Sequence, residues 1–166
     1  MLMNWTYLRL GFILNNNDIF RLLLSTFNLN EKATIKVFSL AGVATSQEQI
    51  AAWLDEGDKT CIKLTDKELA VFLNGFINFK RGKRDGEQAK PENHLNNNMI
   101  FQKLRIALSL KTEDILNILE LADFHLSKHE LSALFRKPAN KHYKKCRDET
   151  LQLFLQGIQL QTQYGA

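Results

Sequence analysis

The sequence concentrates positive charge in one short stretch, residues 136–147, which reads "RKPANKHYKKCR". His142 and Tyr143 are interleaved among its cations. Clustered Lys and Arg side chains attract phosphate groups without reading a base sequence. Solubility alone would explain the cluster equally well. The cations are Arg136, Lys137, Lys141, Lys144, Lys145 and Arg147.

The segment before this stretch, "ILNILELADFHLSKHELSALFRK", predicts a helix, a short turn and a second, capped helix. This order is typical of a helix-turn-helix, whose second helix enters the major groove of DNA. If Leu131, Leu134 and Phe135 face inward, the outward side chains would be Lys128, His129, Ser132 and Arg136. An arginine can donate two hydrogen bonds to guanine. A solvated polar helix face is the alternative, since the turn is longer than in the tightest such motif.

The predicted nucleic-acid-binding residues therefore combine the outward helix face with the basic stretch. They are Lys128, His129, Ser132, Arg136, Lys137, Lys141, Lys144, Lys145 and Arg147.

Metal and nucleophile chemistry is less well supported by the spacing of the residues. His125 precedes the capped helix, so it does not share a helical face with His129. His142 and Cys146 have the spacing of a ligand pair, but no third or fourth ligand accompanies them. Phosphate loops and nucleophile elbows do not occur in the sequence. We therefore expect a non-enzymatic protein with no catalytic residue, no metal and no cofactor.

The elements that must position these side chains are written twice along the chain. The letters LNNN occupy residues 14–17 and again residues 95–98, an offset of 81. A one-residue insertion after Pro138 changes the offset to 82, at which Lys63 matches Lys145 and Gly75 matches Gly157. Such self-similarity predicts a tandem duplication. Each copy of about 65 residues would be marginal alone, so we expect the two to share one core.

Each copy is predicted to form four short helices, because its apolar residues recur at helical spacing and Gly or Pro marks most breaks. Ser46 with Gln49, and Ser127 with Glu130, predict a capping box at the third helix of each copy. Gly75 and Gly157 lie within the fourth helices, where close backbone packing would explain them. The fold class is thus all-α, with about eight helices and helix-turn-helix-like segments.

The asparagine triplets have a mechanical explanation, since an Asn side chain can accept an unpaired N–H group at a helix start. Only one residue of each triplet can be the N-cap. The other two are left for a turn, a contact between copies or a ligand.

The domain boundaries follow from the repeat. Residues 1–13 form an atypical N-terminal extension without a counterpart, of which we expect residues 1–12 to be dispensable, and residues 14–80 form repeat one. A basic and polar linker spans residues 81–94, repeat two spans residues 95–160, and residues 161–166 form a C-terminal tail.

The two copies differ where the second is basic. The positions in copy one that match the outward set are Gln47, Glu48, Ala51 and Asp55, with two acids and no base. A symmetric DNA reader is therefore not expected. If nucleic acid binds, repeat two binds it, while repeat one scaffolds, dimerises or contacts another partner.

Several stretches resemble the YehS-like bacterial proteins, a family known as domain of unknown function 1456. They are LNNN, "KLRIAL" at 103–108, "LSKHELSALFRKP" at 126–138 and the late "FLQG" at 154–157, echoed by "FLNG" at 72–75. The resemblance covers most of residues 14–160 and implies a duplicated helical domain. It implies no activity, catalytic residue or cofactor.

Whole-chain composition bounds the setting in which the protein works. No uncharged stretch of about 18 residues is present, so a membrane-spanning helix is not expected. Two cysteines that form no framework favour a reducing, cytoplasmic location. The net charge of +4 is modest, so any attraction for phosphate is local.

We therefore expect a binding protein, with nucleic acid as the favoured partner through repeat two. A protein-protein interaction adaptor that binds no nucleic acid is the alternative. The sequence does not predict the oligomeric state.

Overall fold

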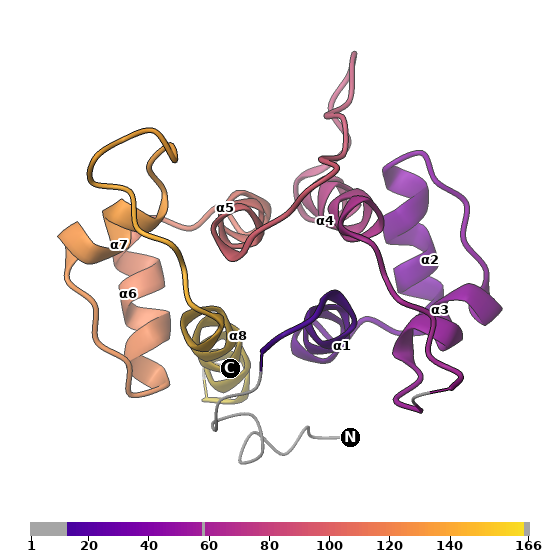
Figure 1. The fold of residues 1–166 in the computed structure, drawn as a ribbon, viewed down its shortest axis with the longest axis horizontal. Coiled ribbons are helices and arrows are strands. Elements are labelled where there is room, and N and C mark those ends of the chain that lie inside the picture. The colour runs from indigo at the N-terminus through magenta and orange to yellow at the C-terminus, as the bar shows by residue number, and fades with distance from the viewer. Residues whose placement is uncertain (1–12, 58, 165–166) are drawn as a thin grey trace.

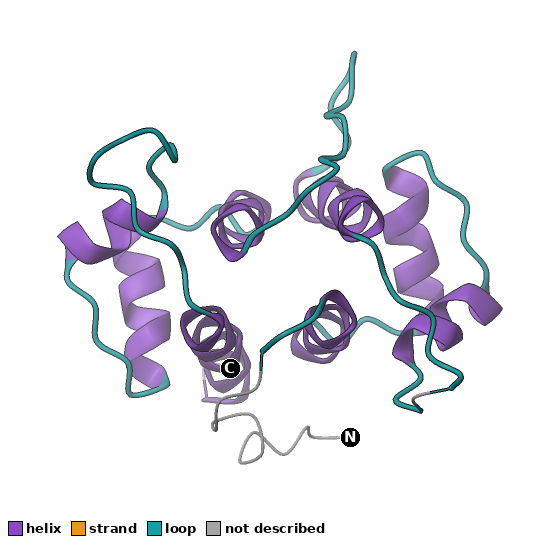
Figure 2. Cartoon of the chain, in the orientation of Figure 1, coloured by secondary structure: helices purple, strands orange, loops and turns teal. Residues whose placement is uncertain are grey.

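A computed structural model describes residues 13–57 and 59–164, and within these residues the chain forms eight helices and no strand (Figures 1 and 2). The predicted all-α fold is confirmed. The helices of copy one are α1 (Asn16–Thr26), α2 (Glu31–Leu40), α3 (Gln47–Leu54) and α4 (Asp66–Arg81). Those of copy two are α5 (Asn97–Ala107), α6 (Thr112–Leu121), α7 (Lys128–Leu134) and α8 (Asp148–Tyr164).

The two copies pack against each other through their first and fourth helices. Figure 1 shows α1, α4, α5 and α8 grouped at the centre, with α2 and α3 on one side and α6 and α7 on the other. The first helix of each copy packs against the fourth helix of the other copy, so that α4 contacts α5 and α1 contacts α8. This reciprocal arrangement gives the chain an approximate twofold symmetry.

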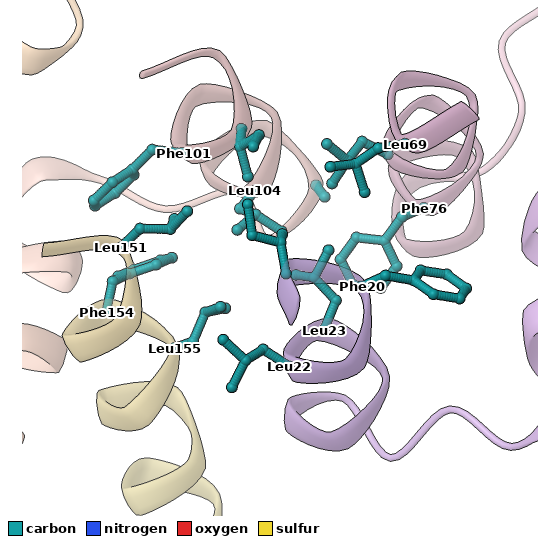
Figure 3. Close-up of a cluster of buried hydrophobic side chains, with 14 of the residues drawn as sticks. Phe20, Leu22, Leu23, Leu69, Phe76, Phe101, Leu104, Leu151, Phe154 and Leu155 are labelled. Atoms are coloured by element: carbon teal, nitrogen blue, oxygen red, sulfur yellow. The ribbon is translucent and has the colours of Figure 1, made fainter. Parts of the chain in front are cut away.

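A single hydrophobic cluster runs through both copies, as expected for units that are marginal alone. In Figure 3, Leu22 of α1 points toward Leu155 of α8, and Leu23 of α1 and Leu104 of α5 point into the space between the central helices. All four of these side chains are almost fully buried. The central helices therefore form the core between the copies, while α2 and α6 pack behind α4 and α8.

The glycines within the fourth helices mark close backbone contacts, as predicted. A Cβ atom on Gly75 would collide with the carbonyl oxygen of Val37 in α2. A Cβ atom on Gly157 would collide with the carbonyl oxygen of Ile118 in α6. The same contact is thus built twice, once in each copy.

Polar side chains define the helix starts. Ser127 and Glu130 form the predicted capping box of α7, with hydrogen bonds of 3.0 and 3.1 Å. The prediction is half right for α3, because the Ser46 side chain accepts a hydrogen bond from the Gln49 N–H but no reciprocal bond from the Gln49 side chain is formed. The Ser46 hydroxyl still satisfies one N–H group of the first turn, that of Gln49.

Two helix ends differ from the prediction, and one predicted segment falls almost entirely outside the described residues. Helix α7 ends at Leu134, so Arg136 lies in the turn that follows and not on the helix face where the sequence placed it. Helix α8 continues to Tyr164, past the predicted end of repeat two at residue 160. Residues 1–12 of the predicted N-terminal extension lie outside the described residues.

Candidate nucleic-acid interface

The basic stretch forms a loop that leaves α7 and returns to α8, seen in orange between these helices in Figure 1. Buried Asn98 holds both ends of this loop. Its side-chain amide donates to the carbonyl oxygens of Leu134 at 2.9 Å and Lys144 at 2.8 Å. Its side-chain oxygen accepts from the N–H of Cys146 at 2.9 Å. The last asparagine of the second triplet therefore fixes the loop that carries the predicted site.

A backbone hydrogen bond closes the loop further, since the Lys144 N–H donates to the Ala133 carbonyl oxygen at 3.0 Å. The ring of His142 lies edge-on to that of His129 in α7, with 6.2 Å between their centroids. The fold thus brings the outward face of α7 and the basic loop into one continuous surface.

All nine predicted binding residues are exposed. Within the described part of the chain, none of the six loop cations forms an ion pair, so their charges remain available to a ligand. Lys128 on α7 differs, because its ammonium lies 3.1 Å from the Glu113 carboxylate. The backbone and hydroxyl of Ser127 lower the pKa of Glu130, which keeps a negative charge on the α7 side. Of these two parts of the surface, the loop therefore carries more unpaired positive charge than α7.

A pocket of about 330 Å³, which was not predicted from the sequence, opens between α5 and this loop. Its walls combine apolar side chains with amide, hydroxyl and guanidinium groups, and with the carboxylate of Glu92 and the ammonium of Lys103. Leu134, Phe135, Pro138 and Tyr143 contribute from the end of α7 and the loop, while Met99, Gln102 and Ile106 contribute from α5. The signal in the sequence was indirect: Asn96 and Asn98 of the repeated LNNN also line it.

Copy one has its own pocket of about 490 Å³ at the corresponding place, with different chemistry. Asp55 occupies the position that matches Arg136, and Cys61 occupies the position that matches Tyr143. Arg21, which matches Gln102, is paired with Asp18 at 2.8 Å. The duplication therefore provides two corresponding pockets of mixed charge. Asp55 and Glu56 line the first together with Arg21 and Lys63, whereas Arg136 and Lys103 line the second together with Glu92.

The histidines and cysteines of the described residues do not gather into a metal-binding group. His125 pairs with Glu120 at 2.6 Å, and this hydrogen bond raises the pKa of the His125 imidazole. Burial, with a smaller effect of Asp148, raises the pKa of the Cys146 thiol to about 12, so that this thiol stays protonated. Within residues 13–57 and 59–164, no three His, Cys, Asp or Glu side chains form a group suited to a metal ion.

The fold and the repeated site define a tandem-duplicated helical protein. The family model described as "Protein of unknown function (DUF1456)" matches residues 16–82 and again residues 97–163, and the chain belongs to this family. The chain is 40% identical over 148 residues to the uncharacterized protein YehS of Escherichia coli (strain K12). That alignment covers 86% of this chain and 93% of the relative. No solved structure gives a significant match.

In the described residues, no helix combines the length and the hydropathy that are needed to cross a lipid bilayer.

Proposed function

We propose that this chain is a non-enzymatic nucleic-acid-binding protein that contacts phosphates through the loop of repeat two. The observation that supports this most directly is the set of six exposed cations at residues 136–147, none of them in an ion pair within the described chain. The same stretch contains no carboxylate. Phosphate neutralisation by such cations supplies most of the sequence-independent affinity for nucleic acid.

The buried Asn98 clamp strengthens this proposal, because it holds the loop at both ends. Cations on an ordered loop lose less conformational freedom on binding than cations on a free tail. In copy one the equivalent segment carries Asp55 and Glu56, which would repel phosphate. The proposal therefore assigns binding to repeat two alone.

Phosphate contact is better supported than base reading in a major groove. Helix α7 has only seven residues, and Arg136, the side chain suited to guanine, follows its end. A link of six residues separates α6 from α7, from Ala122 to Ser127. We therefore expect binding with little sequence preference, although α6 and α7 keep the order of a helix-turn-helix.

Two free thiols, Cys61 and Cys146, are compatible with a reducing compartment. The proposal places the protein in the cytoplasm, where nucleic acid is accessible.

The experiment measures affinity for a generic nucleic-acid strand at rising salt concentration. For the unaltered chain, the logarithm of affinity should fall linearly with the logarithm of salt, with a slope of about 0.9 per phosphate contacted on duplex and about 0.7 on a single strand. The double variant Lys144→Glu/Lys145→Glu should bind more weakly. The slope of its salt dependence should be smaller by the contribution of at least two phosphate contacts. Both side chains are exposed, so folding should be retained.

Copy one supplies the matched control, because Lys63 corresponds to Lys145 and is equally exposed. Lys63→Glu should leave the affinity almost unchanged. Equal losses from Lys63→Glu and Lys145→Glu would refute assignment to repeat two. Absence of binding by the unaltered chain at about 50 mM salt, a condition that favours phosphate contacts, would refute the proposal and leave a protein-interaction adaptor as the function to test.

A further inference from the structure

The pocket beside the basic loop has a fixed apolar floor. Phe135 is held in place by the ring of Phe101, with centroids 5.2 Å apart, and by the Arg105 guanidinium, 4.7 Å from its ring centroid. Met99, Ile106, Leu134 and Pro138 complete the apolar lining. The volume of about 330 Å³ falls within the range of roughly 300–1,000 Å³ that is common for small-molecule sites.

Unused hydrogen-bonding groups face this floor. Within the described residues, the Gln102 amide and the Tyr143 hydroxyl have no hydrogen-bond partner. Two further polar side chains of the lining have partners: Asn98 holds the loop, and Lys103 is held by Asn74 at 2.6 Å and Glu92 at 2.9 Å. The second carboxylate oxygen of Glu92, which also lines the pocket, is buried and accepts no hydrogen bond within the described residues. The pocket therefore offers an amide and a phenol to a ligand that is both flat and polar at its edge.

One loop cation lines the same pocket, and three more are within two positions of lining residues in the chain. Arg136 is one of its lining residues, and Lys137 follows directly in the chain. Lys144 follows Tyr143, and Lys145 comes next. A ligand that occupies the pocket would thus extend toward several positive charges, which favours one with phosphates beside its ring.

We infer that this pocket receives one unpaired base of a single-stranded nucleic acid, while the flanking phosphates contact the loop cations. A nucleobase is flat, forms hydrogen bonds at its edge and is joined to phosphates on both sides. These properties match the apolar floor at Phe135, the Gln102 amide and the Tyr143 hydroxyl, and the cation Arg136. A base within a duplex is stacked and paired, and would have to be extruded at a cost. The inference rests on the proposed function and narrows it to single strands.

The corresponding pocket of copy one does not offer this combination. Cys61 stands in place of Tyr143, so the aromatic ring is missing. Asp55 stands in place of Arg136 and would repel a phosphate. Copy one therefore serves as an internal control for the site.

The experiment compares two single strands of equal length, one with thymine bases throughout and one with abasic sugars. Both carry the same phosphates, so any difference in affinity reports on the bases. The intact chain should bind the thymine strand roughly 5- to 150-fold more tightly, as expected for one stacked base. Tyr143→Ala should abolish most of this difference, while Tyr143→Phe should keep most of it because stacking needs only the ring. Cys61→Ala in copy one should leave the difference intact.

The possible results separate the pocket from the loop. Equal, salt-dependent affinity for both strands would overturn the pocket inference while leaving phosphate binding by the loop in place. A preference for thymine that survives Tyr143→Ala, or tighter binding of a duplex of the same length, would also overturn it. If the unaltered chain bound neither strand at low salt, the proposed function itself would be refuted. An apolar peptide would then become the occupant of the pocket to test. Urea unfolding of each variant would verify that Tyr143, which is only partly buried, is not required for folding.

Discussion

At the scale of single residues, the three asparagines of each LNNN have three different structural tasks. Asn96 is an N-cap, whose side chain accepts from the Met99 N–H at 2.9 Å. Asn97 donates to the Asp148 carboxylate at the start of α8, and Asn98 clamps the loop before it. Asn15, Asn16 and Asn17 repeat this division in copy one. The identical triplet therefore recurs because the same three-part connection is built twice.

This division predicts that Asn98→Ala destabilises the protein more than Asn96→Ala does. Loss of Asn98 leaves two carbonyl oxygens and one N–H without their partner, and an unsatisfied buried group costs about 1–3 kcal/mol. We expect a loss of about 2–4 kcal/mol in the free energy of unfolding, against about 1 kcal/mol for the exposed cap. Urea titration of both variants measures the difference, and equal losses would contradict the clamp.

At the scale of elements, the fourth helix of each copy is fitted closely to the second. Helix α8 places Gly157 against the backbone of Ile118 in α6, and α4 places Gly75 against Val37 in α2. A glycine costs a helix about 1 kcal/mol relative to alanine, so propensity alone would favour alanine at both positions. Close approach of the helices outweighs this preference.

Gly157→Ala should therefore destabilise the protein, although alanine is the better helix former. The new Cβ atom would lie only 2.8 Å from the Ile118 carbonyl carbon, and backbone atoms cannot move aside cheaply. We expect the free energy of unfolding to fall by about 1–3 kcal/mol, the usual cost of overpacking. Lys67→Ala, at an exposed position in α4, should change it by less than about 0.5 kcal/mol. A stabilised Gly157→Ala protein in urea unfolding would show that the helices can separate freely.

At the scale of the whole molecule, two carboxylates connect the copies reciprocally. Asp66 at the start of α4 accepts from the Asn16 amide of its own copy at 2.7 Å and from the Leu95 N–H of copy two at 2.9 Å. Asp148 at the start of α8 accepts from the Asn97 amide at 2.6 Å and from the Leu14 N–H of copy one at 2.8 Å. Each copy thus anchors the chain entering the other, alongside the shared core.

The Asp66 link predicts a dependence of stability on pH. Hydrogen bonds from Asn16 and then Leu95 lower the pKa of Asp66 below its ordinary value of 3.8. A lowered pKa in the folded state stabilises the protein above pH 3.8, and this contribution disappears as the pH falls through the folded-state pKa. Asp66→Asn should therefore be less stable than the unaltered chain near neutral pH, with the difference narrowing at pH values below 3.8.

Urea unfolding of both proteins over this pH range provides the measurement. Asp85→Asn, at an exposed linker position with no hydrogen bond or ion pair in the described chain, is the control and should show no such convergence. A stability difference for Asp66→Asn that stays constant down to about pH 2, below the range where carboxylates titrate, would show that the charge of Asp66 does not matter.

The sequence by itself determined the duplication, the eight helices, the capped helix starts and the close packing at the glycines. These features are encoded in residues a few positions apart, because helix periodicity and N-cap chemistry are local. It also placed the nine predicted binding residues at exposed positions, where the structure finds them. Three local details departed from the expected pattern: α7 ends at Leu134 and leaves Arg136 in a turn, α3 lacks the reciprocal bond of its capping box, and α8 continues to Tyr164.

The tertiary structure decided what each copy does for the other. Asn98 reaches partners at Leu134 and Lys144, and Asp66 reaches Leu95, over separations that no local spacing encodes. The pocket likewise forms only because α5 is brought beside the loop after α7. Periodicity specifies which face of a helix is apolar but not which of several similar apolar faces it meets. In a duplicated chain, the apolar face of a first helix could pack against the fourth helix of either copy. Only the tertiary structure shows that α1 contacts α8 and that α5 contacts α4.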